Sequence, residues 1–185
     1  MVRLIEDNIE EYLAEIQNRN QEDYNEVYKA VDEILEDVKK NKDEALKKYT
    51  MEFDKVSLSN LEVIRDEIEE AYKTIDKELL ETIRIAKENI CSYHEKQIRR
   101  SYKYKPEGKD IILGQLINPI EKVGIYVPGG KAAYPSTVLM NAIPAKIAGV
   151  NEIIMITPPQ RDGKIKDSIL VAADMAGVDR IFKVG

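Results

Sequence analysis

The positions of proline and glycine divide this chain into two parts that must fold differently. Residues 1–100 contain neither residue type, whereas all 7 prolines and all 9 glycines lie at or after Pro106. Proline removes a backbone hydrogen-bond donor and glycine admits left-handed backbone, so both concentrate where a chain turns or an element ends. We therefore expect helices in the first part and short elements joined by tight loops in the second.

Apolar periodicity predicts where the helices of the first part lie. Residues 24–38 place apolar side chains at steps of three and four, with Asp and Lys on the opposite face. Segments 43–53, 64–72 and 79–93 repeat this pattern. Asp76 precedes the last of them and is a predicted N-cap. This part reads as a helical layer that covers another surface.

The second part begins as a β-hairpin and continues as alternating strands and helices. Residues 101–105 alternate in polarity, a polar turn follows, and residues 111–117 are apolar, which predicts two antiparallel strands. Further strands are expected at 123–127, 153–157 and 180–184, and helices at 136–148 and 167–176. This alternation predicts a parallel sheet covered by helices, and the continuously apolar strands indicate burial on both faces.

Together these elements predict an α/β fold with an N-terminal helical layer, a β-hairpin and an incomplete Rossmann-like β-α-β-α-β parallel sheet. We assign residues 1–118 to the helical region with the hairpin, and residues 119–185 to a partial Rossmann-like domain. Gly149 and Gly177 follow the two predicted helices of that domain, where each can end a helix in left-handed conformation. Because the last predicted strand ends beside the final residue, we expect a truncated chain, the N-terminal portion of a longer protein.

Composition and charge exclude several classes of protein. The chain is 43% hydrophobic and 34% charged with a net charge of −6, which is typical of a globular protein and not of a basic nucleic-acid-binding one. Cys91 is the single cysteine, which excludes an internal disulfide and a cysteine-based metal cluster. The acidic N-terminal segment lacks the apolar core of a signal peptide, and no apolar run is long enough to span a membrane. We expect a soluble, cytoplasmic protein.

The segment 123–137, VGIYVPGGKAAYPST, is the strongest candidate for a binding site. In an open α/β sheet, the loop after a strand's carboxyl end lies at the ligand crevice. Gly129 and Gly130 allow backbone N–H groups to approach a ligand closely, and a helix N-terminus follows them. The pattern is neither G-x-G-x-x-G nor a Walker loop, since Lys131 and Thr137 have the wrong spacing. Spacing alone leaves a ligand loop and a tight structural turn as equal alternatives.

Other candidates have structural interpretations of comparable or greater weight. Tyr126 could stack on a planar ring or pack in the core. His94, the single histidine, could act as a base, but its place at the end of an apolar helical stripe favours a structural role. The basic run 99–105 is interpreted as a solvated face. The polar loop 158–163 either helps to wall a pocket beside segment 123–137 or simply connects two elements.

Long stretches of the sequence resemble one enzyme family. The segments NPIEKVGIYVPGGKAAYPSTVLMNAIPAKIAGVNEIIMITPP and AADMAGVDRIFKVG are similar to the N-terminal region of histidinol dehydrogenase, as are YTMEFDKV, ENICSYHEKQ and ILGQLINPIEKVG. The likeness extends from about Asp43 to Gly185. It implies an NAD- and zinc-dependent enzyme of histidine biosynthesis that oxidises L-histidinol to L-histidine through the aldehyde. It also implies a homodimer with incomplete Rossmann-like domains.

Few of the family's known site residues have counterparts in this sequence. Tyr126 matches the tyrosine that contacts NAD in the family, and Pro128, Gly129 and Gly130 match its neighbours in the same motif. The family's catalytic Glu-His pair and zinc ligands have no counterpart here, so no catalytic or metal-binding residue is assigned. We expect a partial NAD site in a chain that is inactive when isolated. The alternatives are a stand-alone nucleotide-binding or regulatory module, and a structural role in dimer assembly.

Overall fold

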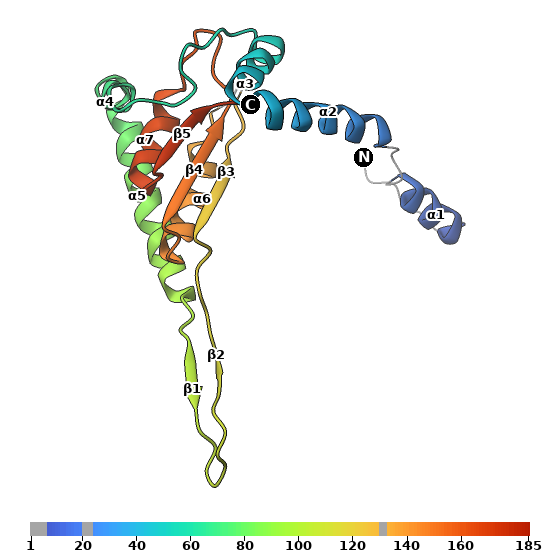
Figure 1. Cartoon of the computed structure of the whole chain (residues 1–185), viewed down its shortest axis with the longest axis vertical. Coiled ribbons are helices and arrows are strands. Elements are labelled where there is room, and N and C mark those ends of the chain that lie inside the picture. The colour runs from blue at the N-terminus through green and yellow to red at the C-terminus, as the bar shows by residue number, and fades with distance from the viewer. Residues whose placement is uncertain (1–6, 20–23, 130–132) are drawn as a thin grey trace. The chain divides into compact units, whose positions relative to one another are not determined.

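The structure is a computed structural model that describes residues 7–19, 24–129 and 133–185. The chain divides into two compact units, Met1–Ala45 and Leu46–Gly185. The first unit contains α1 (Ile9–Arg19) and α2 (Asn25–Asn41), both visible in Figure 1. The helix predicted over 24–38 is therefore confirmed as α2, whereas α1 was not predicted. No residue of α2 is buried within this unit.

The helices that enter the second unit follow the predicted segments, with one difference. Segment 43–53 was expected to form a single α-helix. It forms α3 (Asp43–Tyr49), which continues as a π-helical turn, η1 (Thr50–Asp54), and ends at Lys55 in left-handed conformation. Next come α4 (Arg65–Thr74), α5 (Lys77–His94) and a short 3₁₀ turn, η2 (Glu95–Gln97). The predicted N-cap is confirmed, because the Asp76 carboxylate accepts a hydrogen bond of 2.9 Å from the N–H of Leu79.

The predicted hairpin and the parallel sheet are both present. The hairpin pairs β1 (Tyr102–Tyr104) with β2 (Leu113–Gln115) in antiparallel orientation. The sheet has the order β3-β4-β5 with all strands parallel, and the two crossovers are helices. Its elements are β3 (Lys122–Tyr126), α6 (Pro135–Ile147), β4 (Glu152–Thr157), α7 (Asp167–Ala176) and β5 (Arg180–Lys183). Gly149 and Gly177 have φ of 91° and 80°, as predicted for residues that end helices in left-handed conformation.

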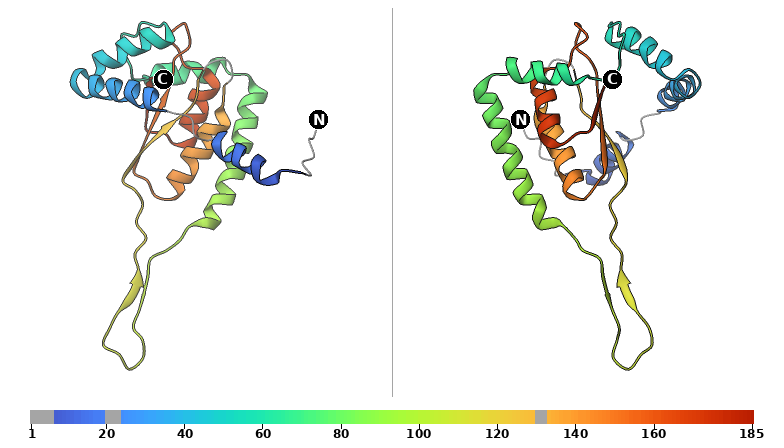
Figure 2. Two further views of the ribbon diagram at one scale, coloured as in Figure 1. Left: turned by 90° about the vertical axis from the view of Figure 1, so that its right-hand side faces the viewer. Right: turned by 60° about the vertical axis from the view of Figure 1, so that its left-hand side comes forward.

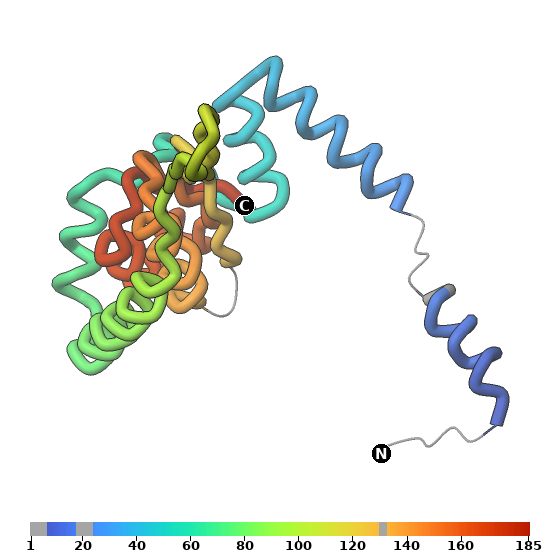
Figure 3. The backbone as a smooth tube through the Cα atoms, turned by 90° about the horizontal axis from the view of Figure 1, so that it is seen from below, coloured from blue at the N-terminus to red at the C-terminus, as the bar shows by residue number. Residues whose placement is uncertain are grey.

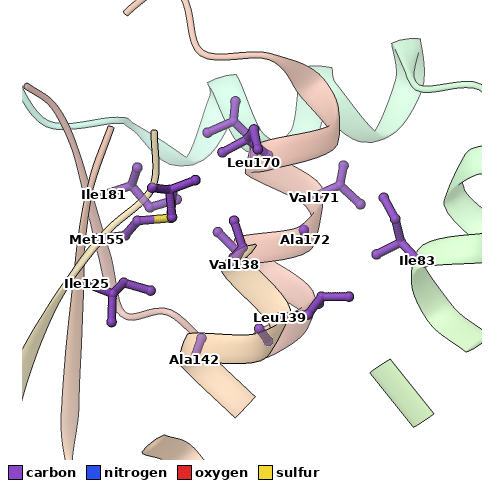
Figure 4. Packing of buried hydrophobic residues seen from close by; sticks show 14 of the residues in the cluster. Ile83, Ile125, Val138, Leu139, Ala142, Met155, Leu170, Val171, Ala172 and Ile181 are labelled. Atoms are coloured by element: carbon purple, nitrogen blue, oxygen red, sulfur yellow. The ribbon is translucent and has the colours of Figure 1, made fainter. Parts of the chain in front are cut away.

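The core of the second unit lies between the sheet and its helices. Figure 2 shows α6 and α7 on one face of the sheet, and Figure 3 shows α4 and α5 on the outer side of these two helices. Ile125, Met155 and Ile181 point from the three strands toward α6 and α7 (Figure 4). Ile83 of α5 closes the same cluster from the far side, so one apolar core joins three layers.

The prediction that the strands are buried on both faces was wrong. Burial alternates along β4, and Tyr126 and Ile156 on the uncovered face are 53% and 37% exposed. The reason is the strand order: two successive crossovers of the same hand, running in the same direction, place both helices on one side of the sheet. Lys122–Glu152 and Arg180–Glu62 ion pairs lie on the uncovered side. In this chain, the sheet has one buried face and one face that is partly open to solvent.

A hydrogen bond from Tyr72 to Asp174 ties α4 to α7, and the burial of this phenol predicts that stability falls at alkaline pH. The two atoms lie 2.9 Å apart, and burial, reinforced by this bond, raises the pKa of Tyr72 from its ordinary 10 to about 12. The unfolded phenol ionises from pH 10 while the folded one stays neutral, so stability should be intact below pH 10 and fall by about 2 kcal/mol toward pH 12. Chemical denaturation at several pH values should show this loss, and Tyr72→Phe should remove it. The same substitution at exposed Tyr93 is the control.

Candidate functional site

The loops after all three parallel strands meet at one edge of the sheet. A Cβ atom added to Gly129, beyond β3, would clash with the ring of Pro158, which follows β4. A Cβ atom at Gly185, beyond β5, would lie 2.7 Å from Cβ of Pro158 and 3.4 Å from Oδ2 of Asp54. Both glycines are therefore required by close packing and not by backbone conformation. The carboxyl edge of an open parallel sheet is also where α/β folds bind their ligands.

An open pocket of about 890 Å³ lies at this edge. Its lining comes from η1, from the end of β3 and from the loop after β4. The residues are Phe53, Asp54, Lys55, Tyr126, Gly129, Pro158, Pro159, Gln160, Arg161 and Asp162. The loop 158–163 thus contributes to the wall of a pocket, which decides between its two interpretations. A pocket of this size can hold a ligand as large as a nucleotide.

Tyr126 is positioned by the pleat of β3. Ile125 and Val127 point into the core and are buried, so Tyr126 between them points to the uncovered side. The residue is 53% exposed, so part of its side chain is open to solvent in this chain. It lines the pocket together with Gly129. Pro128 is half-buried beside a small neighbouring hollow that it shares with Gly129 and Pro158, and Gly130 lies outside the described residues.

The wall formed by Phe53, Asp54 and Lys55 was missed by reasoning from the sequence. These residues lie about seventy positions before Tyr126, and neither periodicity nor spacing connects segments so far apart. The available signal was the family likeness of the segment YTMEFDKV, which contains all three. The π-helical turn ends at Asp54, and π-helical turns occur frequently at functional sites.

Some charged groups of the pocket have hydrogen-bond partners within the chain and others do not. The Nζ of Lys55 donates a 2.6 Å hydrogen bond to the carbonyl of Glu52, and the Asp162 carboxylate accepts one of 3.0 Å from the N–H of Lys164. Asp54 is half-buried and has no hydrogen-bond or ion-pair partner among the described residues. Burial raises the pKa of Asp54 above its usual value because the charged form loses hydration. Arg161 likewise has no hydrogen-bond or ion-pair partner in the part of the chain that the structure describes.

His94 and the basic run lie elsewhere. His94 is the last residue of α5, and its Nδ1 lies 2.7 Å from Oε1 of Gln97. Its edge contacts the Tyr93 ring, in agreement with the structural role predicted for it. Arg99, Arg100 and Lys103 are exposed, in agreement with the interpretation of the basic run as a solvated face.

The residues that the structure describes do not by themselves fit a zinc ion. Within residues 7–19, 24–129 and 133–185, no group of three or more His, Cys, Asp and Glu side chains could hold a metal. Zinc sites need at least three such ligands, so the described residues do not form one by themselves. In the same described ranges, no helix is long and apolar enough to cross a membrane.

Comparison with known proteins identifies the family. The family model described as histidinol dehydrogenase matches residues 17–185 of the chain. The chain belongs to the histidinol dehydrogenase family. The match includes η1, the Tyr126 loop and the loop after β4, so all walls of the pocket lie within the part that is typical of histidinol dehydrogenases.

Individual histidinol dehydrogenases support this assignment. The chain is 48% identical to the enzyme of Clostridium acetobutylicum over 188 residues and 48% identical to that of Methanocaldococcus jannaschii over 185 residues. Each alignment covers all of this chain but 43% of the relative. The crystal structure of histidinol dehydrogenase from Elizabethkingia anophelis superposes with a TM-score of 0.82 at 37% identity, covering 90% of this chain and 37% of that one. The chain thus spans less than half the length of the histidinol dehydrogenases that it matches.

Proposed function

We propose that this chain forms the NAD edge of an enzyme that oxidises L-histidinol to L-histidine through the aldehyde, a step of histidine biosynthesis. The observation that carries the proposal is the pocket at the carboxyl edge of the sheet, with Tyr126 and Gly129 of the family motif in its wall. Membership of the histidinol dehydrogenase family supports the choice of this reaction. The position agrees with the general place of nucleotide ligands in open α/β sheets.

Within this proposal, Tyr126 offers an exposed aromatic face on which a planar ring of NAD can stack. Gly129 keeps the loop in contact with Pro158, where any side chain would force the loop away. Pro128, beside it, restricts the backbone of the loop, and Gly130 extends the same motif. These residues bind and orient the cofactor. When bound, NAD supplies the acceptor for the hydride that leaves the carbon of the alcohol.

Oxidation of an alcohol also requires a base for the hydroxyl proton and, in this family, zinc. Neither function is assigned to residues of this chain, and the side chains of its described residues do not fit zinc. We therefore infer that the 185-residue chain binds NAD but does not turn over histidinol by itself. The complete enzyme is proposed to be a cytoplasmic homodimer.

Titration of NAD into the isotope-labelled 185-residue chain, followed by amide NMR spectra, tests the proposal. Shifts should concentrate around residues 53–55, 126–129 and 158–162. Tyr126→Ala should weaken binding about tenfold or more, because stacking on an aromatic side chain contributes about 1–3 kcal/mol per base. Tyr102→Ala is the matched control, since Tyr102 is similarly exposed but lies on the hairpin.

Two results would contradict the proposal. The first is a spectrum that NAD does not change at millimolar concentration, or that changes equally in both variants. The second is steady NADH formation by the purified chain with histidinol, NAD and zinc, which would show that the chain holds the complete catalytic machinery.

A further inference from the structure

A second pocket, of about 380 Å³, lies at the amino edge of the sheet, opposite the edge that carries the Tyr126 loop. Its walls come from the end of α5 with the residues that follow it, from the stretch between β2 and β3, and from the end of α6. Figure 1 shows the hairpin leaving the second unit at this edge, away from the C-terminus. None of its lining residues belongs to the pocket at the carboxyl edge, so the two pockets are separate.

Contacts within the chain fix the walls of this pocket. The hydroxyl of Ser101 accepts a 2.8 Å hydrogen bond from the N–H of Ile117 and donates one of 3.3 Å to its carbonyl, which ties the two sides of the hairpin together at their base. A Cβ atom added to Gly149, just beyond α6, would lie 3.4 Å from Cγ of Pro119, so the end of α6 packs on the stretch that follows β2. The pocket is therefore formed before any ligand binds.

The lining combines apolar side chains with two polar ones that have no partner. Ile117, Pro144 and Ile147 are half-buried and form the apolar part, and Ile147 also packs against the core. Arg99 and Asn118 have no hydrogen-bond or ion-pair partner among the described residues. Small-molecule sites have this composition, because apolar contacts provide affinity and a few polar groups fix the orientation of the ligand.

The charge around this pocket favours an anion. Segment 96–109 contains six basic residues and one acid, so it has a formal charge of +5 on a chain whose net charge is −6. The ends of α5 and α6 bring partial negative charge to the same edge, but the carbonyls of Pro144, Ala145 and Lys146 each already accept a backbone hydrogen bond. The unpaired guanidinium of Arg99 has a planar fork that matches a carboxylate, and the amide of Asn118 can donate to the same group.

We propose that this pocket binds a small organic carboxylate with an apolar body. Arg99 and Asn118 hold the carboxylate, and the body packs on Ile117, Pro144 and Ile147. The volume of the pocket accommodates a body as large as a phenyl ring on a short linker. The site goes beyond the proposed function, because it lies at the other edge of the sheet and takes no part in the oxidation.

Three probes test this site by amide NMR titration of the isotope-labelled 185-residue chain: 3-phenylpropionate, its uncharged amide, and propionate. We expect 3-phenylpropionate to shift the signals of residues 94–99, 117–119 and 144–148. The amide should bind about tenfold weaker, because it loses a hydrogen bond between charged groups. Propionate should also bind about tenfold weaker or worse, because it lacks the apolar ring.

Arg99→Gln should weaken the binding of 3-phenylpropionate about tenfold and remove its advantage over the amide. Arg100→Gln is the matched control, since it removes the same charge from the next residue, which is exposed and does not line the pocket. It should change the binding of 3-phenylpropionate less than about twofold.

Equal binding of 3-phenylpropionate and its amide to the unaltered chain would overturn the inference, as would equal losses for the two variants or shifts that lie outside the named residues. The comparison of probes needs no substitution, so it decides the point even if a variant folds poorly. The shifts expected for these probes and those expected for NAD lie at opposite edges of the sheet. Failure of this inference would therefore leave the proposed function standing, and failure of NAD binding would leave this inference standing.

Discussion

Glu67→Ala should lower the free energy of unfolding by about 3 kcal/mol, since removing one partner of a buried ion pair leaves an uncompensated charge. Glu67 accepts a 2.5 Å hydrogen bond from Nζ of Lys183, whose side chain is only 9% exposed at the end of β5. The second carboxylate oxygen accepts a 3.1 Å hydrogen bond from the N–H of Ile64, before α4 begins. The substitution thus leaves the buried ammonium group of Lys183 without its partner, and it also removes a hydrogen bond that caps α4.

Two companion variants separate this mechanism from a general weakening of α4. Glu69→Ala removes an exposed acid of the same helix that pairs with Arg65 at 3.5 Å, and should change stability by less than about 0.5 kcal/mol. Lys183→Met replaces the buried ammonium by an apolar chain and should cost less than about 1 kcal/mol. Urea denaturation of the four proteins measures these differences. A loss for Lys183→Met as large as that for Glu67→Ala would refute the explanation.

Most of the sheet could be predicted from the sequence because each of its elements ends at a proline or a glycine. β3 stops before Pro128, β4 before Pro158, and α7 before Gly177. These residues set boundaries that periodicity alone leaves open by several positions. The first part of the chain has no such markers, and there the π-helical turn and α1 escaped prediction. Both depend on packing and register that local preference does not determine.

The covering of the sheet could have been predicted correctly from the order of its strands. Strands that are adjacent in sequence and in the sheet, joined by right-handed crossovers, place successive helices on one face. The continuous apolar runs suggested instead that both faces were buried. Ile154 and Ile156 point to the uncovered side, so their apolar character does not arise from contact with α6 or α7.

In the candidate site, residues that are neighbours in the sequence could be predicted, whereas residues brought there from a distant segment could not. Tyr126 and Gly129 could be found because a strand, a proline and two glycines follow one another within a few residues. Phe53 and Asp54 could not be found in this way, because a half-buried carboxylate acquires its position only when η1 meets the ends of three strands. Only the likeness of YTMEFDKV to the family pointed to that segment, and it gave no role to any residue in it.

Leu139→Ala should cause the second large loss of stability, about 3–5 kcal/mol, because the truncation leaves a cavity that the surrounding layers cannot fill. Leu139 lies on α6 and is 2% exposed, and α6 is packed between the sheet and α5, as Figure 4 shows. Two rigid layers hold the walls of the cavity apart, so relaxation is small.

Met140→Ala is the matched control for Leu139→Ala, since the next residue of the same helix is 53% exposed. It makes a similar reduction in side-chain size and should change stability by less than about 1 kcal/mol. Thermal and urea denaturation of both variants should therefore differ by several kcal/mol. Equal losses would mean that α6 is not held between two layers, and that the interior of the second unit is not the single core assigned to it.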